Sequence, residues 1–199
     1  MKVEIATLEN MGAWEIFDRD ESMNVIDSTW IFNCKRYPDG LIKKFKAQFC
    51  ARGDKQFEGT DFFETYVPVV QLKTIQLVLI VEVLLGLKSN KGNVTAAFLH
   101  ADTPENEKVY VEITRGFEQS SKNGHRKCLK LKNMLYGLCQ IPRDFWQYLT
   151  KKLEQSGPKQ SKSDPCIFSG EKVTCIVYID DILFWDRNKD DIHNLATHL

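Results

Sequence analysis

The stretch VYIDDILFW, residues 177–185, places two adjacent carboxylates, Asp180 and Asp181, inside an otherwise apolar and aromatic run. Two neighbouring ionised carboxylates repel each other, and flanking aromatic side chains lower the local dielectric constant, so the pair is costly without a cation. Mg²⁺ prefers oxygen ligands, and two such ions can clamp the attacking and leaving oxygens of phosphoryl transfer. The alternative is a solvated hairpin turn, because aspartate is a common turn residue.

The residues on both sides of the pair predict a β-hairpin. VTCIVY, residues 173–178, and ILFWD, residues 182–186, have strand composition, and the turn between them would hold Ile179, Asp180 and Asp181. Further strands are predicted in NVTAAFL (93–99), VYVEI (109–113) and CLKLK (128–132).

Two helices are predicted between these strands. Residues from about Thr74 to Leu85 are apolar almost all round and are followed by Gly86, which predicts a buried core helix. Pro142 and Gly157 bracket an amphipathic helix with Phe145, Trp146, Leu149 and Leu153 on one face. Strands interleaved with a few helices, and no repeats, favour an α+β fold.

A second hairpin is predicted nearer the N-terminus. The tetrapeptide Tyr37-Pro38-Asp39-Gly40 is typical of a type I turn. After it, Lys44, Lys46 and Gln48 alternate with Phe45, Ala47 and Phe49, so one strand face should be basic and presented while the other packs. Residues 34–55 hold seven basic and two acidic residues in a chain of zero formal charge. Such a patch suits a polyanionic partner, and a solvated face is the alternative.

Composition excludes several other classes of protein. The chain has 199 residues and 43% hydrophobic content, which is ordinary for a globular protein, and its longest apolar stretch, residues 77–87, is too short to cross a bilayer and carries Glu82. The six cysteines have no CxxC spacing and no signal-peptide core precedes them, so we expect reduced thiols inside the cell. Neither the four histidines nor the cysteines indicate a zinc site or a nucleophile–base pair.

Several stretches resemble one known family. YIDD at 178–181 resembles the catalytic hairpin of reverse transcriptases. FKAQFCARGDKQFEGTDFFETYVPVV (45–70), GNVTAAFLHAD (92–102) and LYGLCQIPRDFW (135–146) resemble further blocks of the copia-type LTR retrotransposon reverse transcriptase, in family order and at family spacing. The resemblance runs from about Trp30 to Leu199.

The resemblance implies a right-hand polymerase that copies RNA into DNA with two Mg²⁺ or Mn²⁺ ions. Residues 1–29 would be an N-terminal extension, 30–72 a fingers-like region with the basic hairpin, and 73–199 a palm-like region. The fold would be an antiparallel sheet with packed helices. Most of the thumb would be missing, because the chain ends soon after the catalytic hairpin.

The family's metal ligands fall on four positions of this sequence. These are Asn93, the backbone carbonyl of Val94, Asp180 and Asp181. Asn93 departs from the family, which has aspartate there: an amide keeps the size and one acceptor oxygen but loses the negative charge and adds an N–H donor. Asp102 is a poor substitute, because metal coordination tolerates little displacement. We therefore expect weak or absent polymerase activity.

The resemblance also implies residues that bind the incoming nucleotide. Phe98 matches the bulky residue beneath the sugar, which rejects a 2′-hydroxyl by steric clash, and a plain core phenylalanine is the alternative. Lys46 and Arg52 would contact the triphosphate. Tyr136, Gly137 and Gln140 match the block that lines the nucleotide and template pocket. Gln48 and Cys139 stand where the family often has basic residues.

Three functional hypotheses follow, in order of preference. The first is a degenerate reverse transcriptase fragment with impaired catalysis. The second is an active RNA-directed DNA polymerase, and the third is a non-catalytic nucleic-acid-binding relic, marked by salt-dependent and metal-independent binding. The implied partners are an RNA or DNA template with primer and dNTPs, with no membrane, in the cytoplasm with nuclear contact. The sequence predicts no oligomeric state.

Overall fold

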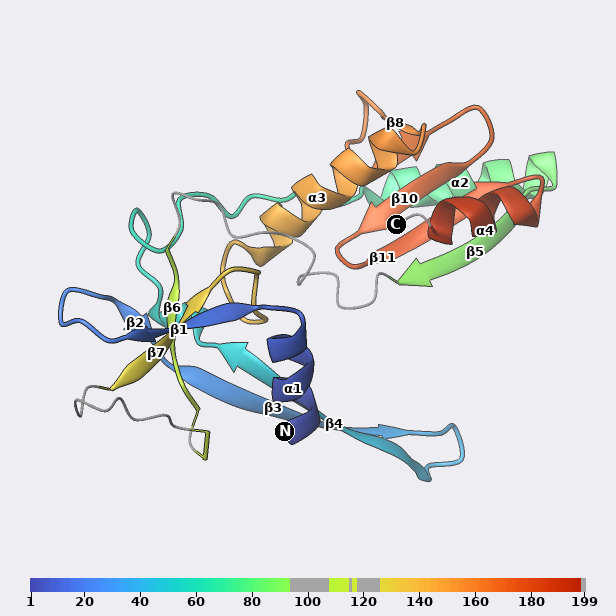
Figure 1. The fold of residues 1–199 in the computed structure, drawn as a ribbon. Coiled ribbons are helices and arrows are strands. Elements are labelled where there is room, and N and C mark those ends of the chain that lie inside the picture. The colour runs from blue at the N-terminus through green and yellow to red at the C-terminus, as the bar shows by residue number, and fades with distance from the viewer. Residues whose placement is uncertain (94–107, 115, 118–125, 198–199) are drawn as a thin grey trace. The chain divides into compact units, whose positions relative to one another are not determined.

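The computed structural model describes residues 1–93, 108–114, 116–117 and 126–197 (Figure 1). These residues form four α-helices and several sheets, which confirms a mixed fold of helices and mainly antiparallel strands. The chain divides into two compact units. The first holds Met1–Thr65 and Phe98–Asp144, and the second holds Tyr66–Ala97 and Phe145–Leu199. Within the described ranges, no helix is long and apolar enough to cross a membrane.

The first unit is built around a four-stranded sheet. Its elements are α1 (Lys2–Asn10), β1 (Trp14–Asp18), β2 (Val25–Ile26), β3 (Ser28–Arg36), β4 (Ile42–Ala51), the short 3₁₀ helix η1 (Gly53–Lys55), β6 (Tyr110–Glu112) and β7 (Lys127–Leu131). The sheet order is β1-β7-β6-β2, and β3 and β4 pair separately. The predicted strands β6 and β7 pair antiparallel, with Val111 opposite Leu129. Phe49 is fully buried in this unit and lies against the rings of Trp14 and Trp30, at centroid distances of 5.9 and 5.4 Å.

The hairpin of β3 and β4 forms with its turn at the predicted tetrapeptide. The backbone N–H of Gly40 donates to the carbonyl of Tyr37 at 2.9 Å, and Gly40 has a φ of 87°. The prediction that its apolar face packs is correct only at the base. Phe49 is buried, but Phe45 is 74% exposed. Phe32, on the same face, is also 67% exposed, so among the described residues no layer covers the outer part of this apolar face.

The second unit is a five-stranded antiparallel sheet with helices. Its elements are α2 (Leu72–Leu85), β5 (Lys88–Asn93), most of α3 (Ile141–Gln155), β8 (Lys159–Gln160), β9 (Ile167–Ser169), β10 (Thr174–Tyr178), β11 (Asp181–Asp186) and α4 (Lys189–Thr197). The strand order is β5-β11-β10-β9-β8. A core cluster of Val70, Cys166, Ile176 and Trp185 lies on one face of this sheet.

Helix α3 confirms the periodicity seen in the sequence. It runs from Ile141 to Gln155, and its residues Phe145, Leu149 and Leu153 are buried as predicted. Gly157 follows the helix with a φ of 114°, a value that L-residues with side chains rarely adopt.

Helix α2 has the predicted end but not the predicted burial. It ends at Gly86, whose left-handed φ of 62° forms the cap. None of its residues is buried, and Val83 and Leu84 are 81% and 76% exposed, so the prediction of a buried core helix is wrong. The physical reason is that only one side of the helix, which carries Ile75 and Val78, packs on the core cluster.

The strand predicted at 93–99 begins earlier than expected. β5 starts at Lys88 and includes Asn93, and residues 94–99 lie outside the described residues. The helix end at Gly86 thus leads almost directly into the strand that carries position 93.

The carboxylate of Asp164 ties the start of α2 to the chain just before β9. It accepts hydrogen bonds from the N–H of Gln71 (3.2 Å), the hydroxyl of Thr74 (2.6 Å) and the N–H of Cys166 (3.0 Å). Burial by itself would raise the pKa of Asp164, but these hydrogen bonds outweigh it and the pKa is lowered. The fold therefore favours the ionised carboxylate.

We expect Asp164→Ala to lower the free energy of unfolding by about 2–3 kcal/mol at neutral pH, because three donors lose a charged acceptor. Since the folded-state pKa of Asp164 is lowered, its contribution is present above the ordinary aspartate pKa and is lost as the pH falls through the folded value. Urea denaturation at several pH values measures this. An equal loss from Asp39→Ala, in an exposed turn, would contradict it.

The cysteines are free thiols, and four of them are buried. Burial raises the pKa of Cys50 to about 11 and the pKa of Cys175 to about 12. Thiols with such pKa values are protonated at neutral pH and make poor nucleophiles.

Candidate active site

The two carboxylates stand at the end of an antiparallel hairpin. β10 and β11 pair with Val177 opposite Ile182 and Tyr178 opposite Asp181. The turn therefore contains only Ile179 and Asp180. The prediction that Asp181 lies in the turn is wrong, because its pairing with Tyr178 makes it the first residue of β11.

The turn holds Ile179 in an uncommon backbone conformation. Its φ is 56°, and a β-branched residue at positive φ is a genuine outlier. The ladder on either side fixes the two-residue loop, which leaves Ile179 and Tyr178 44% and 50% exposed. Such strain is found at functional sites more often than elsewhere.

Strand β5 brings position 93 beside the hairpin. β5 pairs antiparallel with β11, and Asn93 is the register partner of Asp181. Two of the four positions that the resemblance assigns to metal binding are thus directly paired across two strands. Val94 and Phe98 lie outside the described residues.

Asp181 already has a cationic neighbour. The ammonium group of Lys91 donates to a carboxylate oxygen of Asp181 at 2.8 Å. Lys91 is the register partner of Leu183, so its side chain reaches diagonally to Asp181, two residues along β11. The Lys91 side chain is 60% exposed and that of Asp181 is 37% exposed, so water partly screens the pair.

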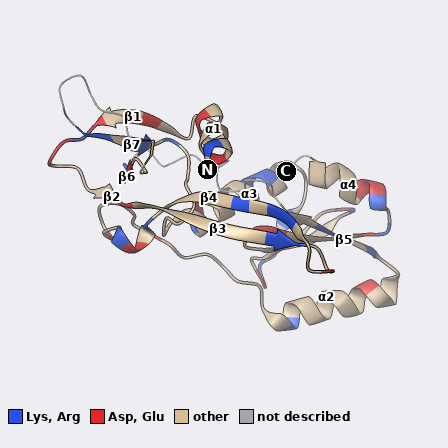
Figure 2. Cartoon of the chain, turned by 90° about the horizontal axis from the view of Figure 1, so that it is seen from below, with Lys and Arg blue, Asp and Glu red and all other residues tan. Residues whose placement is uncertain are grey.

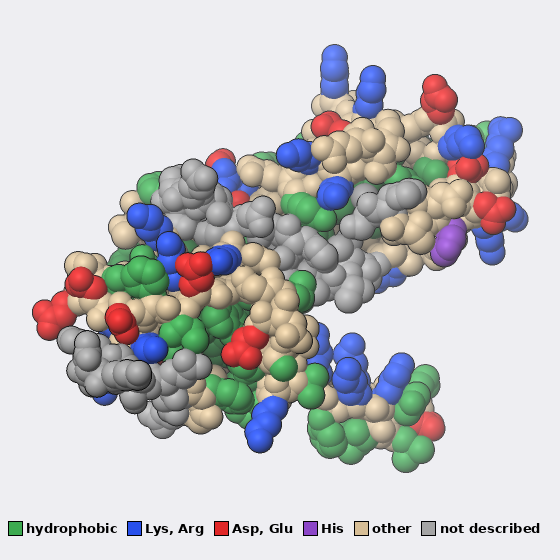
Figure 3. All heavy atoms as spheres, viewed as in Figure 1, with side chains coloured by type: hydrophobic (Ala, Val, Ile, Leu, Met, Phe, Trp, Pro, Cys, Tyr) green, Lys and Arg blue, Asp and Glu red, His purple; other side chains and the backbone are tan. Residues whose placement is uncertain are grey.

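The basic hairpin carries two residues predicted to bind the nucleotide, Lys46 and Arg52. Lys46 lies opposite Asn33, and next to it two lysines, Lys35 and Lys44, face each other across the strands. Figure 2 marks the basic residues along this hairpin, and Figure 3 shows basic side chains along one side of it and hydrophobic ones along the other. Arg52 follows β4, and its guanidinium forms an exposed ion pair with Asp54.

Gly137 and Gly53 form a backbone junction between the loop after β4 and the block at 135–140. The N–H of Ala51 donates to the carbonyl of Tyr136 at 2.8 Å, and the N–H of Gly53 donates to the carbonyl of Gly137 at 3.1 Å. A Cβ on Gly137 would lie 2.2 Å from the Ala51 carbonyl oxygen, and one on Gly53 would lie 2.1 Å from the Gly137 oxygen. Only glycine permits this approach at both positions.

Gln140 is fully buried beside this junction. Its amide nitrogen donates to the carbonyl of Asp61 at 3.2 Å, and its amide oxygen accepts from Gln56 at 3.0 Å. The amide oxygen of Gln56 in turn accepts the N–H of Cys139 at 2.8 Å. Tyr136 is half-buried, and its backbone carbonyl, as described above, is bonded to Ala51.

Comparison with known proteins identifies the family of this arrangement. The model of the family described as "Reverse transcriptase (RNA-dependent DNA polymerase)" matches residues 11–199. The chain belongs to this family. A reverse transcriptase region of copia type is therefore shown, as the resemblance implied.

Three similar proteins are retrotransposon polyproteins. The chain is 29% identical over 204 residues to the retrovirus-related Pol polyprotein from transposon TNT 1-94 of Nicotiana tabacum, which covers 100% of this chain and 15% of the relative. It is 30% identical over 191 residues to that from transposon RE1 of Arabidopsis thaliana, covering 94% and 13%. It is 28% identical over 207 residues to the transposon Ty1-ER2 Gag-Pol polyprotein of Saccharomyces cerevisiae (strain ATCC 204508 / S288c), covering 98% and 11%. The chain thus spans a small part of each relative.

Reverse transcriptases generally use divalent metal ions, but the side chains here do not fit a centre with three carboxylates. Position 93 is an asparagine, and an ammonium group already pairs with Asp181. Among the residues that the structure describes, no group of three or more histidine, cysteine, aspartate or glutamate side chains could hold a metal ion. Asp180 and Asp181 are the two carboxylates at the end of the hairpin of β10 and β11.

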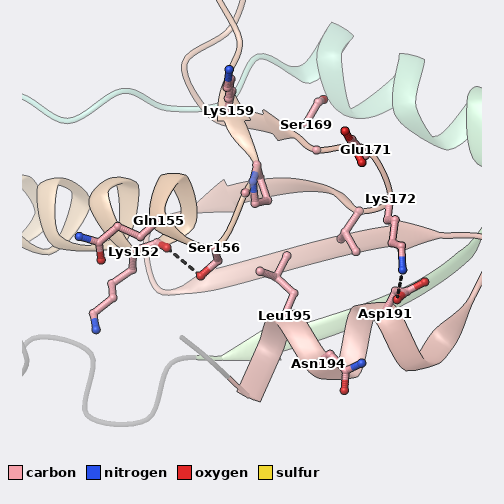
Figure 4. A pocket seen from close by; sticks show the side chains of 14 residues that line it. Lys152, Gln155, Ser156, Lys159, Ser169, Glu171, Lys172, Asp191, Asn194 and Leu195 are labelled. Carbon is pink, nitrogen blue, oxygen red and sulfur yellow. Dashed lines mark hydrogen bonds and ion pairs between the residues drawn. The ribbon is translucent and has the colours of Figure 1, made fainter.

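A separate pocket of about 1050 Å³ lies in the second unit, between the end of α3, the chain around β8 and β9, and α4 (Figure 4). Lys172 and Asp191 form an ion pair of 3.0 Å at its wall, and the hydroxyl of Ser156 donates to the carbonyl of Lys152 at 2.9 Å. Of the residues predicted to bind metal or nucleotide, those that the structure describes do not line it.

Sequence reasoning missed three residues that shape these surroundings. Lys91 pairs with a predicted ligand, and Gln56 and Asp61 hold the block at 135–140. Lys91 lies two positions before Asn93, and in a strand such residues share a face. That spacing could have indicated Lys91, whereas no pattern in the sequence indicates Gln56 or Asp61.

Proposed function

We propose that this chain is the fingers and palm portion of a copia-type reverse transcriptase in which Asn93 impairs catalysis. The observation that carries the proposal is the pairing of Asn93 with Asp181 in the strand beside the hairpin. In the family an aspartate at this position supplies a negative charge toward the metal ions, and an amide cannot. Loss of an outer partner of a metal ligand typically costs about 10- to 100-fold in affinity or activity, so loss of a ligand should cost at least as much.

The proposal assigns roles to the remaining residues. Residues 30–72 act as fingers and 73–199 as palm, after an extension at 1–29. Lys46 and Arg52 approach the triphosphate, Phe98 lies beneath the sugar, and Tyr136, Gly137 and Gln140 support the nucleotide and template pocket. The partners are template, primer and dNTPs, and the location is the cytoplasm. Two nitrogens of the Arg52 guanidinium bind Asp54, so this carboxylate competes with a phosphate for them.

A second candidate function is nucleic-acid binding without catalysis. The facing lysines Lys35 and Lys44 favour it, because like charges opposite each other across strands are destabilising until an anion lies between them. Phosphate contacts of this kind would make binding strongly salt-dependent.

The experiment that tests the proposal measures binding and synthesis together. We expect the chain to bind a fluorescent RNA–DNA template–primer in an anisotropy assay, with or without Mg²⁺, and to extend it only at a background rate when Mg²⁺ is present. Lys44→Gln should weaken binding and reduce its salt dependence by about one phosphate contact. Rapid extension would support the active polymerase instead, and a chain that binds no template–primer would refute both candidate functions.

A further inference from the structure

The ion pair of Lys91 and Asp181 changes the charge of the hairpin end. Lys91, Asn93, Asp180 and Asp181 carry a formal charge of −1 together, whereas three carboxylates without an ammonium group would carry −3. A divalent ion is attracted by that negative charge, so the electrostatic attraction here is reduced twice: by the amide and by the lysine.

The contact is specific in its geometry. The distance from the Lys91 nitrogen to the Asp181 oxygen is 2.8 Å, within the range of a charge-assisted hydrogen bond. The pairing of β5 with β11 fixes both backbones, since six consecutive residues of each strand are in register. Lys91 therefore reaches Asp181 from a rigid strand and not from a loop.

We propose that Lys91 is a built-in cation for the carboxylate hairpin, which takes over charge neutralisation from a divalent ion. This inference deepens the proposed function and rests on it. The ammonium group satisfies the carboxylate of Asp181 in the folded chain, so the hairpin end is stable without metal. A divalent ion has to displace the ammonium group, or bind beside it against its repulsion.

The size of the effect follows from the exposure of the pair. Because the ion pair is partly exposed, the ammonium group competes only weakly with a divalent ion for the carboxylate of Asp181. The repulsion between the ammonium group and a divalent ion about 4 Å away nevertheless persists at the dielectric constant of water. We expect removal of the Lys91 charge to tighten metal binding by about 5- to 30-fold.

Titration of Mn²⁺ followed by electron paramagnetic resonance tests this on the full chain. Lys91→Gln should bind Mn²⁺ more tightly than the chain as given, and Lys91→Arg, which keeps the charge, should not. Lys172→Gln is the matched control, because it removes a lysine paired with Asp191 at 3.0 Å in the same unit. Circular dichroism confirms that each variant is folded, as expected for exposed lysines.

Three results would overturn the inference. These are an unchanged Mn²⁺ affinity in Lys91→Gln, an equal gain of affinity in Lys91→Arg, and an equal gain of affinity in Lys172→Gln. The third result would mean that the net charge of the chain, and not the contact with Asp181, controls Mn²⁺ affinity. The assay is an equilibrium binding measurement without nucleic acid. Its failure is thus distinguishable from failure of the proposed function, which would appear as rapid primer extension by the chain as given.

Discussion

Asn93→Asp is expected to raise the rate of RNA-templated primer extension by at least about 10- to 100-fold in the presence of Mg²⁺ or Mn²⁺. The register of β5 and β11 places position 93 opposite Asp181, so an aspartate there adds a carboxylate to the pair in the hairpin. The size of the gain follows from the loss expected when a metal ligand is replaced. Single-turnover extension of a labelled primer, with enzyme in excess, measures the chemical step directly.

The same assay contains its own controls. Asn93→Asp combined with Asp180→Asn and Asp181→Asn should return to background, because the added carboxylate acts only with the hairpin. Asn93→Asp combined with Lys91→Gln should be faster than Asn93→Asp alone, since the ammonium group on Asp181 is then absent as well. If Asn93→Asp extends primers no faster than the chain as given, Asn93 does not limit catalysis.

Gly137→Ala is expected to lower the free energy of unfolding by about 3 kcal/mol or more. Gly137 has a φ of 95°, which is strained for any residue with a Cβ, and that Cβ would lie 2.2 Å from the carbonyl oxygen of Ala51. Because the obstacle is backbone, it cannot move aside as a flexible side chain does. The junction must open, which also weakens the hydrogen bond between Gly53 and the Gly137 carbonyl.

Gly40→Ala provides a matched control for this prediction. Gly40 has a similar φ of 87°, but nothing lies within 4 Å of its Cβ position. It should therefore show only the backbone strain, about 1 kcal/mol. Urea denaturation followed by tryptophan fluorescence compares the two variants. Equal losses would mean that the close approach at Gly137 contributes nothing to stability.

Local features of the fold could be predicted from the sequence because local chemistry determines them. The turn at 37–40 combines proline, aspartate and glycine in the positions that a β-turn favours, and it forms there. Helix α3 shows apolar residues at helical spacing, and three of them, Phe145, Leu149 and Leu153, are buried, whereas Trp146 is half-buried. In both cases the signal and the structure involve the same few neighbouring residues.

Burial of α2 could not be predicted from its composition. Residues 77–87 are apolar on all sides except at Glu82, and composition alone does not say which side meets the core. The structure shows that Glu82, the one acid of the helix, accepts the indole N–H of Trp185 at 2.7 Å. The charged residue therefore faces the sheet while Val83 and Leu84 face outward, the reverse of what hydrophobicity alone indicates.

The candidate site was predictable in its residue types but not in its pairings. The carboxylates and Asn93 could be identified from the sequence, because each lies within a short motif of consecutive residues. The contact between Lys91 and Asp181 joins residues 90 positions apart in the chain, and it depends on the register of two strands. The spacing of Lys91 and Asn93 places both on one face of β5, but it does not determine which residue of β11 Lys91 meets, because a shift of register by one residue would change every partner.

The most direct test of the account compares primer extension by the chain as given with extension by Asp180→Asn plus Asp181→Asn, with Asn93→Asp as the positive control. The account predicts that the first two chains extend an RNA-templated primer at the same background rate, while both bind the template–primer. If the chain as given extends primers clearly faster than the double variant, the hairpin carboxylates are catalytic beside Asn93, and the claim of an impaired active site is wrong.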